Sequence, residues 1–338
     1  MILSKTPVRI CFGGGGTDVE PYSSEFSGYV LNVTINNYFR SVLNKRKDKK
    51  IIIFSNDTFT AYKFETIEDV NMPEQEFDLI KSIIYFLQPE CGMDIYTHGE
   101  PLRKAGLGAS ASLSTSLIAG ILKIDEKLPD PIDLNDVAEK AFEVEDKILK
   151  NAGGRQDQYA SVYGGFNDIT FSGGSNVKVE RLKISKSFKQ ILEDNLILFY
   201  TGAPHVSGDL VKEQIKSYLE KREESKKSLD ILKDVAYQLR DSIISEDFES
   251  FGKLLTEDWK EKAKFNPLIT TDYMLELHKV VMKNGGIGGR INGAGGGGCL
   301  LWLVSPENKE KILSLLGNKP GTNIDFKFVE RGLEISEI

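Results

Sequence analysis

Residues 101–112 read PLRKAGLGASAS, and they stand between a strand pattern at residues 93–97 and an apolar, proline-free helical pattern at residues 109–122. Glycine adopts a positive φ at little cost and lets a ligand approach the backbone closely. The helix that follows presents unpaired N–H groups and the positive end of its dipole, which attract an anion. Ser110 and Ser112 add hydroxyl groups suited to a phosphate or to Mg²⁺. The segment therefore predicts a phosphate-binding turn. A small-residue helix packed on a sheet is the alternative, and no Gly-Lys-Ser/Thr completes a Walker A loop.

A second glycine-rich turn, GGGGTD at residues 13–18, follows the strand pattern of residues 2–12. Its Asp18 could accept hydrogen bonds from a hydroxylated substrate. Arg9 interrupts the apolar strand just before the turn, and a buried arginine needs an anionic partner. These two features indicate a ligand site, with a flexible turn and a surface arginine as the alternatives.

A third segment, GGRQDQY at residues 153–159, follows a helical pattern at residues 133–149. Phosphoryl transfer needs a group that orients or deprotonates the accepting hydroxyl, and Asp157 suits that role. A carboxylate of the preceding helix suits a Mg²⁺ ion held together with Ser110. Spacing alone does not choose among the acids of that helix, each of which also fits a solvated face: Glu139, Glu143, Glu145 and Asp146.

A fourth segment, residues 285–298, reads GGIGGRINGAGGGG and has nine glycines in 14 positions. That content is too high for ordinary secondary structure, so we expect a closely packed loop against a ligand or against the first glycine turn. A disordered linker is the alternative. The apolar strand pattern at residues 299–304 argues against the linker, because it places the loop inside the fold.

Composition limits the classes of function. The 338 residues carry a formal charge of −7, which gives no general attraction for nucleic acid or anionic lipid. Three scattered cysteines predict neither disulfides nor a metal site, and they fit a reducing, cytoplasmic setting. Three histidines are too few for an obvious metal cluster. No apolar run approaches 18 residues, so we expect no membrane span, and the N-terminus does not resemble a signal peptide.

Strand and helix patterns are mixed along the chain, which predicts an α+β fold of two lobes. The join is expected within residues 171–192, giving an N-terminal domain at 1–185 and a C-terminal domain at 186–338. Further helices are expected at residues 77–86, 211–240, 248–264, 271–283 and 309–316. Further strands are expected at residues 30–43, 51–54, 60–64, 196–200 and 325–329.

The four segments, in this order, resemble the galactokinase, homoserine kinase, mevalonate kinase and phosphomevalonate kinase superfamily, the GHMP kinases. Residues 101–111 are similar to its phosphate loop, P-x-x-x-G-L-G-S-S-A, with Ala109 at the first serine and one extra residue after Pro101. Residues 293–298 resemble its third motif. Residues 7–18, 154–160, 164–167 and 198–202 look most like the heptose 7-phosphate kinase branch.

The resemblance implies a ribosomal-protein-S5-like N-terminal lobe and a ferredoxin-like C-terminal lobe, with the site between them. It implies ATP and Mg²⁺ as cofactors, Asp157 as the catalytic aspartate, and Arg9 as the cation that stabilises the transition state. Ser110 and Glu145 would hold the metal, with Asp146 or Glu143 as rival carboxylates. The nucleotide would contact Lys104, Gly106, Leu107, Gly108, Ala109, Ser110, Ala111 and Ser112. The substrate would contact Gly14, Gly15, Thr17, Asp18, Gln158, Tyr159, His205, Gly295 and Gly296.

Two positions depart from the branch. His205 stands where an arginine suited to a substrate phosphate is expected, and Thr256 stands where histidine is common. The expected reaction is phosphoryl transfer from ATP to a hydroxyl of a small anionic molecule, such as a sugar phosphate of the heptose 7-phosphate type.

Three other functions were weighed. Phosphorylation of the 5-hydroxyl of mevalonate 3-phosphate is the main alternative, and a catalytically silent nucleotide-binding regulator is the alternative from another class. A Rossmann oxidoreductase is excluded, because no βαβ unit carries Gly-x-Gly-x-x-Gly with an acid about 20 positions later. We expect a small-molecule partner, no nucleic acid and no membrane, and the sequence allows a homodimer.

Overall fold

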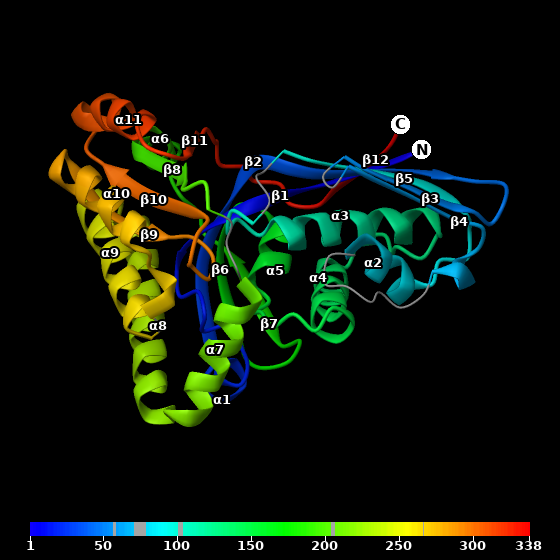
Figure 1. Cartoon of the computed structure of the whole chain (residues 1–338), viewed down its shortest axis with the longest axis horizontal. Helices are drawn as coiled ribbons and strands as arrows, with labels where there is room; N and C mark the ends of the chain where they lie inside the picture. Colours follow the sequence, from blue (N-terminus) through cyan, green and yellow to red (C-terminus); the bar gives the residue numbers. More distant parts are fainter. Residues whose placement is uncertain (57–58, 71–78, 101–103, 204–206, 266) are drawn as a thin grey trace.

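The computed structural model describes residues 1–56, 59–70, 79–100, 104–203, 207–265 and 267–338. Two sheets lie in two lobes, each with helices packed against it (Figure 1). The chain crosses between the lobes after β7 (Val177–Arg181) and returns at its C-terminus, where β12 (Glu334–Glu337) pairs with β1 (Ile2–Gly13). The α+β prediction is confirmed. The predicted boundary between two domains at residues 185 and 186 stays a prediction. Because β12 pairs with β1, the last residues of the chain belong to the N-terminal sheet.

The N-terminal sheet is built on two long strands, β1 and β2 (Gly28–Lys45), which pair antiparallel. The strand order is β12-β1-β2-β5-β3-β4, with β6 pairing both β2 and β7. All pairs are antiparallel except β3 with β5. Bulges interrupt β1 between Pro7 and Val8 and again between Cys11 and Gly13, just before the glycine turn. The remaining strands are β3 (Ile51–Ser55), β4 (Thr60–Phe64), β5 (Met93–Gly99) and β6 (Phe166–Phe171).

Helices cover one face of this sheet (Figure 1). The central one, α3 (Ala109–Ile124), packs against β1 and β2 and is buried along most of its length. Its small residues allow that approach: a Cβ at Gly120 would lie 2.4 Å from a methyl carbon of Leu43. The hydroxyls of Ser112 and Ser116 donate to strand carbonyls, so their burial costs little. The other helices are α1 (Tyr22–Phe26), α2 (Leu79–Leu87), α4 (Leu134–Glu143) and α5 (Gln156–Tyr163), with a 3₁₀ turn at Ile67–Asp69.

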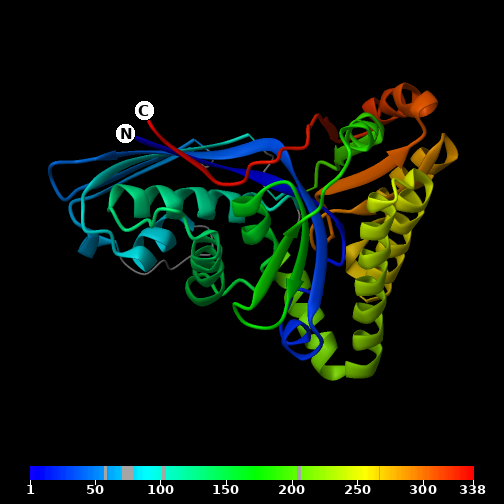
Figure 2. The same cartoon turned by 180° about the vertical axis from the view of Figure 1, so that it is seen from behind.

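The C-terminal lobe has an antiparallel sheet in the order β11-β8-β10-β9. These strands are β8 (Leu196–Tyr200), β9 (Gly286–Ile291), β10 (Cys299–Val304) and β11 (Thr322–Ile324). The helices are α6 (Lys186–Asn195), α7 (Ser207–Glu220), α8 (Arg222–Ile244), α9 (Phe248–Phe265), α10 (Asp272–Lys283) and α11 (Lys309–Gly317), with 3₁₀ turns at Pro267–Ile269 and Pro306–Asn308. Helix α8 contacts β1 and β2 as well as α9, and thereby joins the lobes (Figure 2).

The composition of residues 285–298 predicts a loop along the whole stretch. This prediction is wrong for the first half, which forms strand β9. Glycine is required there by close packing of backbones. A Cβ at Gly288 would lie 1.6 Å from the carbonyl oxygen of Gly252 in α9. A side chain at Gly289 would meet the ring of Trp302 in β10. Strand β9 therefore lies directly against helix α9. This close contact positions the side chains of α9 that face β9.

Three other expected elements have different bounds. The tract at residues 211–240 is two helices, α7 and α8, because Lys221 between them has φ −124° and ψ 53°. The helix expected at residues 133–149 ends at Glu143 and continues as one π-helical turn, Val144–Ile148. The strand expected at residues 325–329 is instead Thr322–Ile324, since the following residues leave the sheet and Phe328 bridges to Ile35 in β2.

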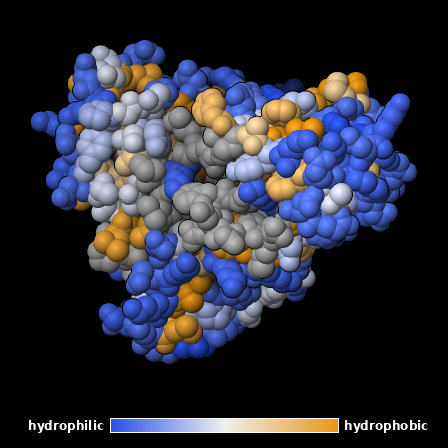
Figure 3. Space-filling view, turned by 45° about the vertical axis from the view of Figure 1, so that its right-hand side comes forward, coloured by the Kyte–Doolittle hydropathy of each residue, from blue (hydrophilic) through white to orange (hydrophobic). Residues whose placement is uncertain are grey.

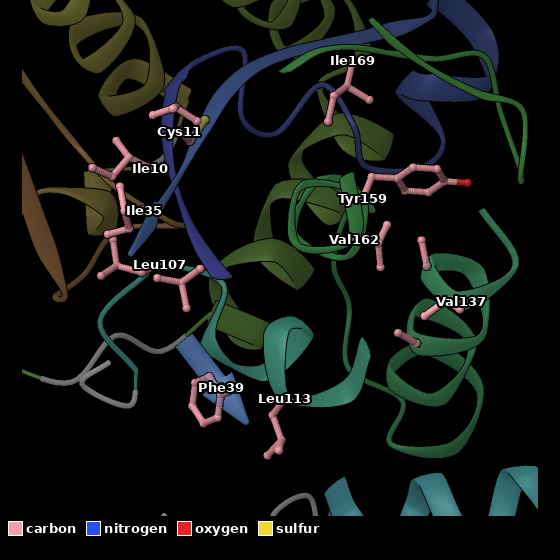
Figure 4. Packing of buried hydrophobic residues seen from close by; sticks show 14 of the residues in the cluster. Ile10, Cys11, Ile35, Phe39, Leu107, Leu113, Val137, Tyr159, Val162 and Ile169 are labelled. Atoms are coloured by element: carbon pink, nitrogen blue, oxygen red, sulfur yellow. The ribbon is translucent and has the colours of Figure 1, made fainter. Parts of the chain in front are cut away.

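A single cluster of buried apolar residues runs through both lobes. Part of it, including Ile10, Leu107, Leu113 and Val162, is seen in Figure 4. Hydrophilic side chains cover most of the coloured surface in Figure 3, as the high content of charged residues leads one to expect. Among the described residues, no helix is both long and apolar enough to cross a bilayer.

Candidate active site

The side chain of Arg9 joins three segments that are far apart in the sequence. Its Nε and Nη2 lie 2.8 and 2.7 Å from Oδ1 of Asp157, and its Nη1 donates to the carbonyl oxygen of Gly106 at 2.5 Å. The backbone N–H of Arg9 also donates to the carbonyl of Leu107. Because the arginine is buried in β1, it fixes the backbone of residues 106–107 and the carboxylate of Asp157 relative to each other.

Asp157 stands in the first turn of α5, at the edge of the glycine turn. A Cβ added to Gly108 would lie 3.2 Å from its Cγ, so a side chain there would displace the carboxylate by a few tenths of an ångström. Its side chain is 28% exposed, which means that it faces an opening and not a closed core. The structure therefore brings Arg9, Asp157 and residues 106–108 together, as the sequence patterns predict.

The glycine turn shapes the start of α3. Gly106 and Gly108 both have φ +76°, in the left-handed region that favours glycine, and the helix begins at Ala109. The third motif packs behind this turn: the N–H of Cys299 donates to the carbonyl of Ala105, and a Cβ at Gly106 would meet the carbonyl of Asn292 at 2.5 Å. The expected contact between the two glycine-rich segments is thus present.

Glu145 lies beside the first turn of α3. Ser110 Oγ donates to its Oε1 at 2.6 Å, and Gln158 Nε2 donates to its Oε2 at 2.7 Å. Burial raises the pKa of Glu145 to about 7, with the nearby charge of Asp157 acting in the same direction and the two hydrogen bonds opposing it. The π-helical turn positions this carboxylate, and such turns are frequent at functional sites.

The rival carboxylates are placed differently. Asp146 is exposed, and Glu143 pairs with Lys147 at 2.6 Å. Within the described part of the chain, no group of three or more histidine, cysteine or acidic side chains could hold a metal. The pair formed by Ser110 and Glu145 offers two hard oxygen ligands, which fits a Mg²⁺ ion that takes its other ligands from phosphates and water.

Asp18 is buried in the turn after β1. Its carboxylate accepts hydrogen bonds from the N–H of Gly16 at 3.0 Å and from the backbone and side-chain nitrogens of Gln156 at 3.1–3.2 Å. Burial raises its pKa, and those backbone hydrogen bonds lower it. Gly154 is required here, because a Cβ would lie 1.9 Å from Asp18 Oδ2. The second and third glycine segments are therefore locked together by one carboxylate.

These groups line one cavity of about 530 Å³ between the two lobes. One part of its wall is apolar and consists of Phe39, Tyr62, Leu79, Ile80 and Leu113. Another part consists of residues predicted from the sequence, which offer polar side chains or backbone N–H and C=O groups: Arg9, Gly15, Asp18, Lys104, Gly106, Gly108, Ala109, Ser110, Ala111, Glu145, Asp157 and Gln158. Such a cavity combines an apolar slot with a few convergent polar groups, as small-molecule sites do.

Several predicted contacts do not line the cavity, because they pack or form hydrogen bonds elsewhere in the fold. Tyr159 is fully buried, donates to Glu139 and packs near Val162 (Figure 4). The Thr17 hydroxyl is taken up by backbone groups of Gly14 and Tyr29. The remaining members of this group are Leu107 in the core, Ser112 bonded to Thr6, Gly14, and Gly295 and Gly296, which pack against residues 268–269 and Leu210. His205 lies outside the described residues.

Three cations of the C-terminal lobe line the cavity and were not predicted: Lys212 on α7, Lys262 on α9 and Arg290 on β9. Lys262 in α9 donates from Nζ to the carbonyl of Gly293 at 2.7 Å. Arg290 in β9 is 1% exposed and pairs with Asp258 at 3.1 Å. The sequence held a signal for Arg290, because an arginine that precedes an apolar strand within a glycine-rich segment parallels Arg9. Lys262 gave no signal among the many lysines of its helix.

Comparison with known proteins agrees with this geometry. A family model for the GHMP kinases N-terminal domain matches residues 78–165, and one for the GHMP kinases C-terminal region matches residues 239–321. D-glycero-alpha-D-manno-heptose 7-phosphate kinase of Campylobacter jejuni is 30% identical and covers 98% of each chain. A mevalonate kinase of Methanocaldococcus jannaschii is 24% identical, covering 94% of this chain and 96% of the relative.

The fold is also found in solved structures. The crystal structure of a D-glycero-D-manno-heptose 1-phosphate kinase from Bacteroides thetaiotaomicron matches with a TM-score of 0.79 at 25% identity, covering 100% of this chain and 99% of that one. The crystal structure of a putative sugar kinase from Campylobacter jejuni matches with a TM-score of 0.76 at 28% identity, covering 100% of this chain and 98% of that one. The chain therefore belongs to the GHMP kinase family, whose members transfer a phosphoryl group from ATP to a hydroxyl.

Proposed function

We propose that this protein transfers the γ-phosphoryl group of ATP to a hydroxyl of a phosphorylated sugar of the heptose phosphate type. The observation that carries the proposal is the position of Asp157, held by Arg9 at the mouth of the glycine turn. The substrate class is supported by the full-length similarity to a heptose 7-phosphate kinase and by the fold shared with a heptose 1-phosphate kinase.

In this proposal, the phosphates of ATP bind at the start of α3. The N–H groups of Ala109, Ser110 and Ala111 lack partners within the helix and lie at the positive end of its dipole. Lys104 lines the same part of the cavity. The apolar wall, including Phe39, Tyr62 and Leu113, suits the adenine ring.

Ser110 and Glu145 would hold Mg²⁺, which in phosphoryl transfer neutralises the charge that develops on the phosphates. Gln158 donates to the far oxygen of Glu145 and so fixes the orientation of that carboxylate. In this arrangement Gln158 positions a metal ligand, whereas the sequence predicts that it contacts the substrate.

Asp157 is proposed to orient the accepting hydroxyl and to take its proton. The Arg9 guanidinium holds Oδ1 of Asp157 and leaves Oδ2 turned toward the glycine turn, next to Gly108. A positioned base of this kind contributes about 10²- to 10⁴-fold to a rate. Gly15 and Asp18, which line the cavity on the other glycine turn, are proposed to contact the sugar.

The test is ADP release from ATP in the presence of a panel of heptose and other sugar phosphates, mevalonate and mevalonate 3-phosphate, with products identified by mass. Turnover of a sugar phosphate, with a mass increase of one phosphoryl group, is expected. Turnover of mevalonate 3-phosphate alone would reject the substrate class and keep the kinase. Binding of ATP without turnover of any member of the panel would favour a silent regulator. Sedimentation of the same preparation measures whether the chain forms a homodimer.

A further inference from the structure

A compact group of charged side chains from α9 and β9 has no part in the chemistry described above. It consists of Arg290 and Lys262, which line the cavity, and of Asp258, which pairs with Arg290. It is called here the Arg290 cluster. Asp258 and Lys262 are four residues apart in α9 and so lie on the same face of the helix, toward β9. Arg290 and Lys262 both reach the cavity wall, although they are only 1% and 7% exposed.

The neighbours of Arg290 satisfy only some of the hydrogen-bond donors of its guanidinium group. Its Nη2 pairs with Oδ2 of Asp258 at 3.1 Å, and its Nε donates to the carbonyl of Ile291. Its buried Nη1 has no hydrogen-bond partner among the described residues. Asp258 is shared, because its Oδ1 accepts the N–H of Gly14 at 3.0 Å. A buried guanidinium donor without an acceptor is costly, so its presence on a cavity wall points to an acceptor supplied from the cavity.

Lys262 also lacks a negatively charged partner. Its only hydrogen bond seen in the described part of the chain goes to a neutral carbonyl, that of Gly293, and no carboxylate there lies within ion-pair distance. Burial lowers the pKa of Lys262, and the charge of Arg290 adds to that effect, while Asp258, Cys11 and Asp18 oppose it. Asp18 is itself occupied by N–H groups of Gly16 and Gln156.

The Arg290 cluster lies beside the glycine turn of residues 13–18, where Oδ1 of Asp258 accepts the N–H of Gly14. Lys262 Nζ lies 3.8 Å from the place where a Cβ at Gly15 would stand, so it faces this turn of residues 13–18. Asp18 in that turn is close enough to Asp157 for their charges to interact. An anionic group held beside Gly15 would therefore leave the rest of a small substrate extending toward Asp157. Lys212, which is exposed on α7 and also lines the cavity, adds a further cation.

We propose that Arg290 and Lys262 form the subsite for the phosphate monoester that the substrate carries before the reaction. This inference rests on the proposed function and names the residues that make the enzyme select a phosphorylated acceptor. A guanidinium offers several N–H donors in a plane, which suits phosphate oxygens, and the lysine adds a point charge. The sequence has histidine at position 205, where an arginine for this phosphate is expected, and the Arg290 cluster provides the positive charge instead.

The test compares wild type with Lys262→Met, Lys262→Arg and Arg290→Lys, using the sugar phosphate that the wild type accepts best. Lys260→Met is the matched control, because Lys260 is exposed on the same helix. For Lys262→Met we expect the KM for the sugar phosphate to rise about tenfold or more, the scale of a lost charged hydrogen bond, while the KM for ATP stays within about twofold. Lys262→Arg should restore most of the affinity, and Lys260→Met should behave as wild type.

Inorganic phosphate is the second probe. It should inhibit the wild type competitively against the sugar phosphate and not against ATP, and Lys262→Met and Arg290→Lys should both weaken that inhibition. An unchanged KM for the sugar phosphate in Lys262→Met, or an equal rise in the KM for ATP, would overturn the subsite. A fall in kcat alone would mean that the cluster only supports the packing of α9 on β9. If the wild type phosphorylates no sugar phosphate, the proposed function fails first and the subsite fails with it.

Discussion

Replacing Glu145 with glutamine is expected to stabilise the ligand-free protein, and by an amount that grows with pH. Burial raises the pKa of this carboxyl from 4.5 to about 7 in the folded protein. The folded state therefore favours the protonated form of Glu145. The stability that this protonated carboxyl contributes is fully present below pH 4.5 and is lost as the pH rises through 7. Glutamine is neutral at every pH, and its amide can still accept from Gln158 and donate to Ser110.

The size of the effect follows from the two pKa values. At pH 8, ionised Glu145 costs the folded state at most about 3 kcal/mol relative to a neutral side chain, and at pH 5 about 1 kcal/mol. The difference in free energy of unfolding between Glu145→Gln and wild type should therefore increase by about 2 kcal/mol from pH 5 to pH 8. The penalty is the cost of holding this carboxylate in a site from which water is partly excluded; if Glu145 holds Mg²⁺ as proposed, function is maintained at the expense of stability.

Urea denaturation at pH 5, 6, 7 and 8, without nucleotide or Mg²⁺, measures the effect. Glu143→Gln is the matched control, because Glu143 precedes Glu145 by two residues and forms an accessible ion pair with Lys147. Removal of that ion pair should change stability by less than about 1 kcal/mol. A Glu145→Gln variant with the same advantage at pH 5 and at pH 8, or with lower stability than wild type at pH 8, would refute the reasoning.

Three further substitutions separate the roles of neighbouring residues. Ser110→Ala should raise the Mg²⁺ concentration needed for half-maximal activity by about tenfold, and an unchanged metal titration would remove Ser110 from the metal site. Gly108→Ala places a Cβ 3.2 Å from Cγ of Asp157 at a φ of +76°, so we expect kcat to fall by about tenfold or more, whereas wild-type kcat would show that Asp157 tolerates the shift. Tyr159→Phe loses only the hydrogen bond to Glu139, so the KM values should not change and stability should fall by about 1 kcal/mol in urea; a raised substrate KM would return Tyr159 to the site.

The sequence was informative where a residue type conflicts with its surroundings. An arginine within an apolar strand led to Arg9, and the structure shows the buried ion pair that such a residue requires. The glycine turn before a helix led to residues 106–110 in the same way. Both inferences depend on local chemistry, which a single sequence contains.

Side chains whose direction depends on the fold were harder to place. Tyr159 follows Asp157 by two positions, and on a helix that spacing turns the two side chains to nearly opposite faces. Because residues 156–163 form α5, Asp157 faces the cavity and Tyr159 faces the core. A prediction of helix for residues 156–163 would have placed Asp157 and Tyr159 on opposite faces. For Thr17 and Ser112 the sequence holds no such signal, since their hydroxyls bond to distant backbone carbonyls.

Glycine-rich segments predict ligand contact or close packing, and the sequence alone does not distinguish the two. Gly288 is needed for the packing of α9 on β9, and Gly154 for the approach of Asp18, although both belong to glycine-rich segments. These requirements come from tertiary contacts between residues far apart in the sequence. The same contacts bring Lys262 and Arg290 to the cavity, and of the two only Arg290 has a signal in the sequence.

The turnover of Asp157→Asn is the most direct measurement of whether this carboxylate acts at the phosphate loop. Steady-state rates with ATP and the accepted sugar phosphate should show kcat lowered by at least about 10²-fold, with the KM for ATP nearly unchanged. Asp146→Asn, an exposed acid close by in the sequence, should retain wild-type turnover. Near-normal kcat for Asp157→Asn would contradict the account.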